Sequence, residues 1–483
     1  MQLLRKVGDE IIIIYNPRKE NVEVGENLKI YDENVGRGIV AQVIEQSLVD
    51  LTGILEDIVR HESMESFSVE ERSPLDVIRY MTDVKNMKMA RAKILKELTS
   101  TDGRLSISPW TGWIPDRNVS IEPLDDDELM KLLNLKGRHP MELGLTVYSR
   151  KPMYIDAFHL QGINIITGKK GSGKSHMGKI LLLGLISHGA RAIVFDINDE
   201  YSKLGFMAEG LDKKSEYYEK IVPLNPGENL YFTLEYIGLD VMYDVMTTVM
   251  GLREASAYTF RNIWSEIEKE GILTIDSLKD RADEERVQIA EAITRRLDQI
   301  EATNIIVDRE GKTLEKLLER ISSGGALIIN LKAKDPVTIA ITVQTILSKL
   351  RELLESGEKP LWIFAEEAHF YLSETAWDDI ITRMRHLGAY QVYLTNTPTA
   401  IPQNVIRQAD NIFLFHLSTQ SDLNYVAPAS KLDAQTIVPI AISLPPHRCM
   451  VVGSATNDYP IIIDTKPLHV RTAGETRLFF EEV

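Results

Sequence analysis

Residues 168–175 combine small, cationic and hydroxyl side chains at the spacing that binds a nucleotide phosphate. The segment reads Gly-Lys-Lys-Gly-Ser-Gly-Lys-Ser. Its glycines allow the backbone to wrap closely around phosphate oxygens, and backbone N–H groups at a helix N-terminus present partial positive charge to an anion. Lys174 can reach the β- and γ-phosphates, and the Ser175 hydroxyl can ligate Mg²⁺. The segment therefore predicts a site for ATP and Mg²⁺.

The residues around this loop favour the same interpretation. Residues 162–167 form a short apolar run typical of a strand, and residues 175–188 form a helical run that ends at Gly189. A strand, a loop and a helix in this order place the phosphate at the N-terminus of the helix. The residues predicted to bind the nucleotide here are Gly168, Lys169, Lys170, Gly171, Ser172, Gly173, Lys174, Ser175 and His176.

A second candidate site lies at residues 361–369, where an apolar run ends in two adjacent carboxylates. Parallel sheets deliver residues at their strand ends to the ligand crevice. Glu366 is predicted to hold Mg²⁺, and Glu367 is predicted to polarise the attacking water. The alternative is a solvated strand end, but the phosphate loop favours the functional interpretation. His369 fits a packing or supporting role better than a catalytic one.

Two further segments carry polar residues at the ends of predicted strands. Residues 194–201 place acidic side chains near the crevice, although a plain loop with solvated acids has the same spacing. Residues 390–394 form a strand followed by Thr-Asn-Thr-Pro, which suits a sensor of the γ-phosphate and adds Asn396 to the nucleotide-binding residues. An arginine before this strand, Arg383 or Arg385, can act as a finger in a neighbouring subunit or be a surface residue. Arg407 is another candidate.

Composition narrows the class of protein. The chain has 483 residues, 44% of them hydrophobic, which suits about three domains with ordinary cores. Its apolar runs are too short to span a bilayer, and no signal peptide is evident, so we expect a cytoplasmic protein without membrane contact. The single cysteine, Cys449, excludes an internal disulfide. The net charge of −16 means that any DNA-binding charge must be concentrated locally.

The pattern along the chain predicts three parts: residues 1–145, 146–436 and 437–483. Short strands at 10–15, 26–31 and 38–45 predict a small N-terminal β-barrel, with a charged helical segment at 52–98. From residue 146, strands alternate with helices, which predicts an α/β fold with a mostly parallel sheet. Residues 228–322 interrupt it as a helical subdomain whose arginines, Arg253, Arg261, Arg295 and Arg296, face solvent or DNA. The last part is predicted to be a β-rich tail.

These motifs, in this order, resemble the HerA/FtsK branch of RecA-like motor ATPases, and most of all its HerA members. Residues 22–45 look like the HAS-barrel that opens HerA proteins, and residues 195–201 look like the family's Asp-x-x-Gly-Glu-Tyr motif. Residues 224–226 look like its Leu-Asn-Pro, and residues 363–369 like its Glu-Glu-Ala-His Walker B. The resemblance implies Glu367 as the catalytic base, and Arg385 as the finger that acts on the adjacent subunit.

The resemblance also implies a partner and an assembly. Such proteins are hexameric rings that pump double-stranded DNA, and HerA works with the nuclease NurA in DNA end resection. Asn396 and Thr397 stand where the family has Gln-Arg, and Asp199 replaces a glycine, so coupling between subunits is the property most affected. The alternatives are a motor for conjugation or DNA packaging, and a nucleotide-dependent ring scaffold that recruits an effector.

Overall fold

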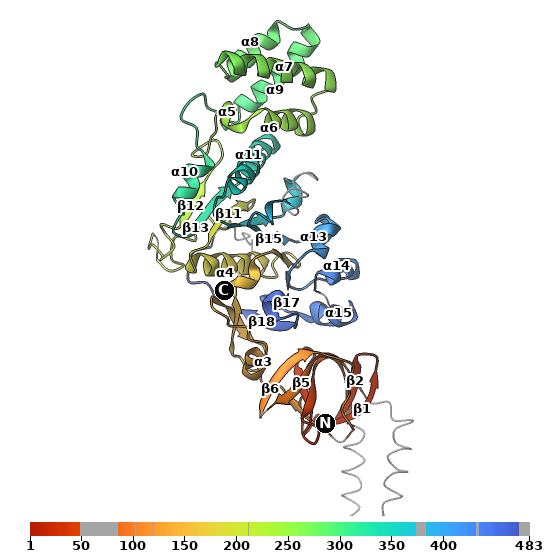
Figure 1. Cartoon of the computed structure of the whole chain (residues 1–483). Helices are drawn as coiled ribbons and strands as arrows, with labels where there is room; N and C mark the ends of the chain where they lie inside the picture. The colour runs from red at the N-terminus through yellow and green to blue at the C-terminus, as the bar shows by residue number, and fades with distance from the viewer. Residues whose placement is uncertain are drawn as a thin grey trace, which may run out of the picture.

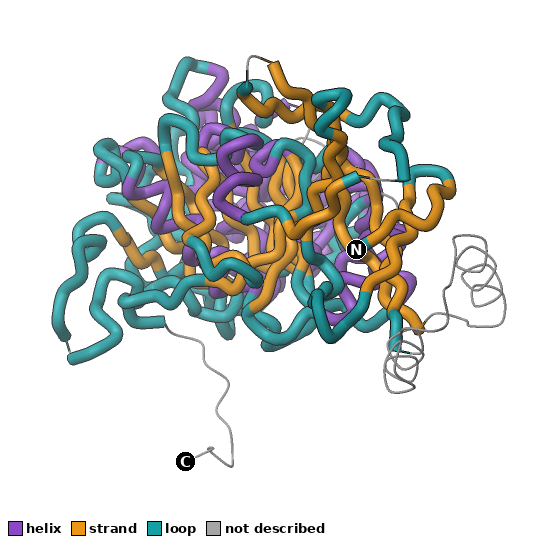
Figure 2. Tube along the Cα trace, turned by 90° about the horizontal axis from the view of Figure 1, so that it is seen from below, coloured by secondary structure: helices purple, strands orange, loops and turns teal. Residues whose placement is uncertain are grey.

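Two sheets and a stack of helices organise the chain in the computed structural model (Figure 1). The curved N-terminal sheet lies at one end, a large mixed sheet in the middle, and the helical stack at the other end. Figure 2 views the molecule from the end that carries the N-terminal strands. The structure describes residues 1–48, 86–101, 103–117, 119–210, 212–372, 383–430 and 434–472.

The N-terminal sheet is antiparallel, with the strand order β1-β2-β5-β4-β3-β7 and with β6 paired to β5. Its strands are β1 (Gln2–Val7), β2 (Glu10–Tyr15), β3 (Asn27–Asp32), β4 (Arg37–Leu48), β5 (Lys88–Thr101), β6 (Arg104–Pro109) and β7 (Ser120–Pro123). Apolar side chains on one face, among them Ile11, Ile13, Leu28 and Ile30, form its core. The predicted small barrel is confirmed as a half-barrel.

The helical prediction for residues 52–98 is wrong at its C-terminal end, because residues 88–98 belong to β5. Ala90, Ala92 and Ile94 are buried on one face of that strand, and the cations between them lie on the other face. Alanine favours helices in isolation, but pairing of β5 with both β2 and β4 decides the local structure here. The rest of the segment, residues 52–85, lies outside the described residues.

The central sheet confirms the predicted α/β, RecA-like fold. Its order is β12-β13-β11-β14-β15-β10-β16-β17-β18-β8-β9, with the strands from β12 to β16 parallel and the last four antiparallel. The strands are β8 (Pro140–Thr146), β9 (Pro152–Asp156), β10 (Ile163–Thr167), β11 (Arg191–Asp196), β12 (Ile221–Leu224), β13 (Gly325–Asn330), β14 (Leu361–Glu366), β15 (Ala389–Thr395), β16 (Asn411–Leu414), β17 (Arg448–Gly453) and β18 (Ile461–Thr465).

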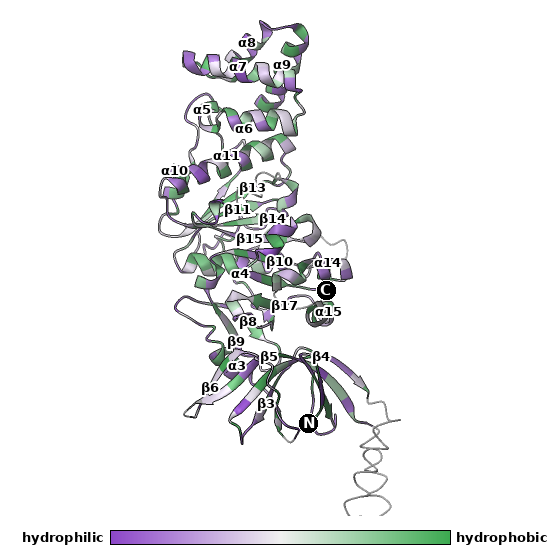
Figure 3. Ribbon diagram, turned by 45° about the vertical axis from the view of Figure 1, so that its right-hand side comes forward, coloured by the Kyte–Doolittle hydropathy of each residue, from purple (hydrophilic) through white to green (hydrophobic). Residues whose placement is uncertain are grey.

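Helices cover both faces of this sheet. On one face α4 (Lys174–Ser187) packs on β10, β11 and β15, and β8 packs against it as well. Because strands cover it on more than one side, most of its residues are apolar. On the other face lie α11 (Pro336–Glu355), α13 (Gln403–Arg407), α14 (Gln420–Val426) and α15 (Ala434–Ser443). Figure 3 shows apolar residues along the central strands and the helices beside them. No helix in the described ranges is long and apolar enough to cross a membrane.

The helical stack comes from the region between β12 and β13. It contains α5 (Leu234–Ile237), α6 (Leu239–Asp244), a π-helix (Val245–Val249), α7 (Glu254–Glu270), α8 (Ile275–Asp283), α9 (Val287–Glu301) and α10 (Leu314–Glu319). Arg296 donates to the carbonyl oxygens of Met250 (3.0 Å) and Gly251 (2.9 Å), so it fixes the start of α7. Arg295 and Arg253 are exposed on this stack.

The sheet continues past both predicted boundaries of the core. Strand β8 begins before residue 146, and β17 and β18 follow residue 436, yet all three belong to the central sheet.

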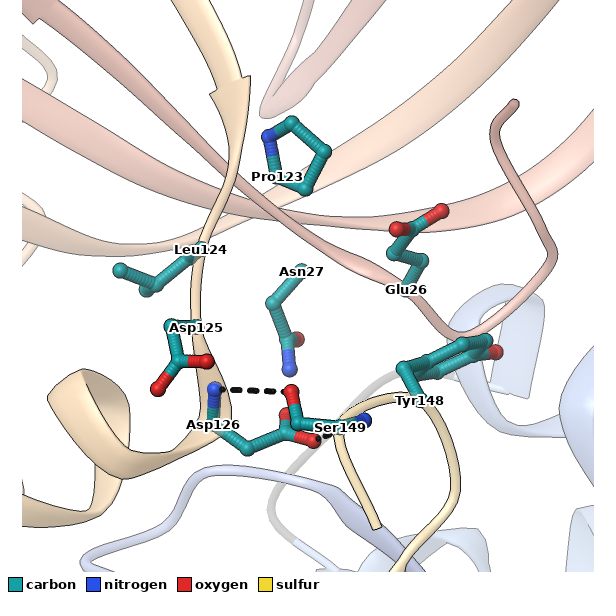
Figure 4. Close-up of a pocket in the computed structure, with 8 residues that line it drawn as sticks. All are labelled: Glu26, Asn27, Pro123, Leu124, Asp125, Asp126, Tyr148 and Ser149. Carbon is teal, nitrogen blue, oxygen red and sulfur yellow. Dashed lines mark hydrogen bonds between the residues drawn. The ribbon is translucent and has the colours of Figure 1, made fainter. Parts of the chain in front are cut away.

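Between the half-barrel and this sheet lies a cavity of 180 Å³ lined by Glu26, Asp125, Asp126 and Tyr148 among others (Figure 4). Three carboxylates line it, so this cavity is unsuited to a phosphate. Asp125 caps α3 (Asp126–Leu132).

Candidate nucleotide site

The phosphate loop leaves β10 after Thr167 and ends where α4 begins. Gly173 precedes the helix with φ of 112°, and Gly171 has φ of 79°, a region that favours glycine. A Cβ atom at Gly173 would lie 3.1 Å from the Phe415 ring, so there is no room for a side chain. The backbone N–H groups of the first turn of α4 have no acceptor within the helix. The loop therefore has the backbone geometry of an anion site.

Lys174 is the first residue of α4 and is only 7% exposed. Its Nζ donates to the carbonyl oxygen of Lys169 at 2.9 Å. Burial lowers the pKa of Lys174 to about 8, although the carboxylates of Glu367, Glu200 and Glu366 act in the opposite direction. The ammonium group is therefore held over the loop, within reach of a phosphate that enters it.

The other predicted loop residues divide into exposed and buried groups. The side chains of Lys169 and Lys170 are exposed, whereas Ser172 is buried and its Oγ has no hydrogen-bond partner. The Nε2 atom of His176 pairs with the carbonyl oxygen of Lys466 at 2.7 Å, and burial lowers its pKa. The imidazole of His176 thus contacts the C-terminal segment, which leaves its backbone N–H as the group that can bind a phosphate.

Glu366 ends β14, in the crevice beside the loop, and is 2% exposed. Neither carboxylate oxygen has a hydrogen-bond partner. Burial raises the pKa of Glu366 well above its usual range, and the nearby carboxylates of Glu200 and Asp196 raise it further. A buried carboxylate without partners is costly unless a ligand completes its environment.

The acidic segment at the end of β11 places further carboxylates near Glu366. Asp196 is fully buried and accepts hydrogen bonds from the backbone N–H groups of Glu200 (3.0 Å) and Tyr201 (2.9 Å). Burial raises the pKa of Asp196 to about 6. Glu200 forms an ion pair with Lys179 at 2.9 Å. The hydrogen bonds to Asp196 thus hold the loop in its conformation, and this conformation places Glu200 at the site.

Glu367 follows in a left-handed conformation, with φ of 45°. Its Oε1 accepts hydrogen bonds from the backbone N–H of Asn396 at 2.9 Å and from the Asn396 side-chain amide at 2.5 Å. Its Oε2 accepts from the Thr395 hydroxyl at 2.9 Å, and His369 Nδ1 lies 3.7 Å away. The structure therefore brings Glu367 and Asn396 into direct contact, and His369 stands beside them as a supporting residue.

Arg385 does not join this group in its own chain. It precedes β15, whereas Asn396 follows that strand, so the two lie at opposite edges of the sheet, about 20 Å apart along a strand of this length. Arg385 Nη2 forms an ion pair with Asp410 Oδ2 at 2.8 Å, and the same oxygen accepts from the backbone N–H of Ile163 at 2.9 Å. Any action of Arg385 on a nucleotide must therefore be on one bound by another chain.

Two site residues were not singled out from the sequence. Lys179 is a buried cation in an otherwise apolar helix, and its position one turn after Ser175 was a usable signal. Thr167, the residue before Gly168, is fully buried and donates from its hydroxyl to the Thr395 carbonyl oxygen at 3.2 Å. A threonine at a strand end carries no such signal, because its hydrogen bond depends on which strand lies beside it.

The side-chain oxygens available as metal ligands at this site suit Mg²⁺ that is bound together with a nucleotide. Among the residues that the structure describes, no three His, Cys, Asp or Glu side chains converge as a metal site of their own. Mg²⁺ commonly binds one or two protein oxygens, substrate phosphates and water. The unpartnered carboxylate of Glu366 and the hydroxyl of Ser175 are suitable protein ligands for such an ion.

Sequence comparison identifies the relatives of this chain. Residues 141–350 match the profile of the helicase HerA central domain. The DNA double-strand break repair helicase HerA of Sulfolobus acidocaldarius is 22% identical over 81% of this chain and 81% of its own length. A probable helicase of Methanocaldococcus jannaschii is 22% identical over 95% of this chain and 89% of its own length.

Solved structures of the bacterial conjugative coupling protein TrwB have the same fold. One matches with a TM-score of 0.51 and 14% identity, and covers 73% of this chain and 94% of TrwB. A second, of TrwB in complex with ADP and Mg²⁺, matches with a TM-score of 0.50 and 16% identity over the same shares of the two chains. The chain thus has the fold of TrwB, matches the HerA central domain over residues 141–350, and is distantly similar to HerA helicases over most of its length.

Proposed function

We propose that this chain is an ATP-dependent DNA translocase or helicase that works as a homohexamer on double-stranded DNA. The observation that carries the proposal is the convergence of Lys174, Glu366 and Glu367 at the carboxyl ends of the parallel strands β10 and β14, which lie on either side of β15. The distant similarity to HerA helicases over most of the chain supports DNA as the partner. A TrwB structure that contains ADP and Mg²⁺ supports a nucleotide in this fold.

Each residue has a role in phosphoryl transfer to water. Lys174 and the loop N–H groups bind the β- and γ-phosphates, and Ser175 and Glu366 would hold Mg²⁺, which would supply positive charge next to the phosphate oxygens. Glu367 orients and polarises the attacking water, and Asn396 contacts the γ-phosphate. Arg385 of an adjacent subunit stabilises the charge that develops in the transition state. The reaction needs positioning and electrostatic stabilisation, which these groups supply.

The position of Arg385 supports a ring. Because it lies at the edge of the sheet opposite to its own Glu367, it can complete a site only if another chain presents its carboxyl edge there. A closed ring of identical subunits satisfies every such interface. We propose six subunits, with the half-barrels as the docking face for a NurA-like nuclease in DNA end processing.

A triplex displacement assay tests the proposal. A translocase should strip a third strand from a duplex only with ATP and Mg²⁺, and Lys174→Ala should fail to do so. The mass in solution should correspond to six copies of the 54.7 kDa chain. A hexamer that binds ATP but displaces no strand on any duplex would favour the ring scaffold instead.

A further inference from the structure

The Thr395 hydroxyl contacts the carboxylate proposed to activate water. Thr395 is the last residue of β15, is 1% exposed, and donates from Oγ1 to Oε2 of Glu367 at 2.9 Å. The backbone of Glu367 is fixed independently, because its N–H donates to the carbonyl oxygen of Leu394 at 2.7 Å. The rotation of the Glu367 side chain is then set by the hydrogen bonds to its two carboxylate oxygens, and the Thr395 hydroxyl supplies the bond to Oε2.

Thr395 is in turn connected to the phosphate loop. Its carbonyl oxygen accepts the Thr167 hydroxyl at 3.2 Å, and Thr167 is the residue directly before Gly168. The two threonines are paired in the register of the parallel strands β10 and β15. Thr395 Oγ1 also accepts from the backbone N–H of Thr397 at 3.0 Å, and the Thr397 carbonyl oxygen, at 3.2 Å, is a second and more distant acceptor for the hydroxyl proton. Three neighbouring strand ends are thereby joined by buried hydrogen bonds.

The two oxygens of Glu367 have different surroundings. Oε1 contacts Asn396, which is exposed and can exchange its amide contact for a phosphate. Oε2 contacts Thr395, which is buried and tied to the P-loop strand. When the side-chain amide of Asn396 leaves Oε1, one lone pair of that oxygen becomes free to accept a proton from water, while the bonds from the Asn396 backbone N–H and from Thr395 keep the carboxylate in place. A general base needs this combination of a free oxygen and a fixed orientation.

We propose that Thr395 is a positioning residue that orients Glu367 for attack on ATP, with Thr167 linking that orientation to the phosphate loop. The inference rests on the proposed ATP hydrolysis. It assigns to Thr395 a role in the rate of hydrolysis and none in the binding of nucleotide, because its hydroxyl donates to Glu367.

The test compares Thr395→Val, which removes the hydroxyl at nearly constant shape, with Thr395→Ser, which keeps it. In the full-length hexamer, Thr395→Val should lower kcat for ATP by about 10- to 100-fold and leave KM within about twofold. Thr395→Ser should recover most of the rate. Thr342→Val is the matched control, since Thr342 is a fully buried threonine of α11 that loses a hydrogen bond of 2.7 Å to the Thr338 carbonyl oxygen.

A double-mutant cycle separates positioning from general loss of stability. In a Glu367→Gln background, Thr395→Val should lower the residual rate by less than about twofold, because the base on which it acts is already absent. Additive losses would contradict the proposal, as would a wild-type kcat for Thr395→Val or an equal loss in Thr342→Val. Should Lys174→Ala retain full hydrolysis, the proposed function itself would fail. An inactive Lys174→Ala beside a fully active Thr395→Val would overturn this inference alone.

Discussion

The two edges of the central sheet differ in how completely their charged groups are paired. At the amino edge each named cation is paired: Arg385 with Asp410 at 2.8 Å, and Arg191 with Glu358 at 3.0 Å. At the carboxyl edge, Glu366 is 2% exposed and has no hydrogen-bond partner. Burial without a hydrogen-bond partner disfavours the charged form of Glu366 and raises its pKa, so a bound cation would supply the partner that the carboxylate lacks. The carboxyl edge is therefore the edge that is suited to bind a ligand.

The largest expected effect comes from removing the cation of the carboxyl edge. Lys174→Ala should lower ATP hydrolysis to background, because the phosphates lose their main positive contact. The fold should persist, since Lys174 contributes one hydrogen bond to a loop carbonyl. Steady-state hydrolysis and a thermal melt measure the two effects. Substantial turnover in this variant would mean that the carboxyl edge is not the nucleotide site.

The next effect tests whether the amino edge of one subunit serves the carboxyl edge of another. Arg385→Ala should bind ATP normally and hydrolyse it about 10³-fold more slowly, as expected for a finger acting in trans. Mixing this variant with Lys174→Ala should restore part of the activity, because mixed rings contain interfaces with both groups intact. Loss of the Asp410 pair also removes a structural contact, so Arg385→Lys provides a control that retains the charge.

If the mixture recovers no ATP hydrolysis although mass measurements confirm that subunits exchange, Arg385 does not act in trans. The finger would then be Arg383 or Arg407, and the contrast between the two edges would concern packing alone.

An effect of comparable size separates the two carboxylates of the carboxyl edge. Glu367→Gln should bind ATP with Mg²⁺ normally and hydrolyse it about 10²- to 10⁴-fold more slowly, the usual contribution of a general base. The amide fits the same pocket, since its oxygen can accept from Asn396 and its nitrogen can donate to Thr395. Fluorescent-nucleotide titration and single-turnover hydrolysis provide the readouts. A larger catalytic defect in Glu366→Gln, with normal binding, would exchange the two roles.

The smallest effect is a dependence of ATP affinity on pH. The pKa of Lys174 is lowered to about 8 in the free protein, and the protonated ammonium is the form that binds phosphate. ATP affinity should therefore be constant below that pH and fall by up to about tenfold per pH unit above it. Lys174→Arg should remove this dependence, because arginine stays protonated throughout. A wild-type affinity that is constant from pH 7 to 9.5 would contradict the buried position of Lys174.

The sequence predicted the segments that carry functional residues better than it predicted the tertiary contacts between those segments. The phosphate loop and the Glu-Glu pair are local patterns, and each requires only a strand end and a fixed spacing, so the strand and helix around Gly173 and the strand before Glu366 could be read directly. The contact between Glu367 and Asn396 depends on β14 and β15 being neighbours, which is a property of the sheet order.

The errors and omissions have the same origin. Residues 88–98 were predicted to be helical because alanine and charged residues favour helices locally, but their pairing with β2 and β4 is long-range. The joining of β17 and β18 to the central sheet is likewise set by tertiary contacts. His176 stays a predicted nucleotide-binding residue through its backbone N–H, but the contact of its imidazole with Lys466, 290 residues further along the chain, was not predictable from the loop motif.

The rate of ATP hydrolysis with and without duplex DNA tests the central claim most directly. A motor whose subunits complete one another's sites should hydrolyse ATP several-fold faster when duplex DNA is present, because DNA aligns the ring. The Lys174→Ala hexamer should remain at background in both conditions. Hydrolysis by the wild-type hexamer that is unaffected by duplex DNA at any length or concentration would contradict the assignment of this chain as a DNA motor.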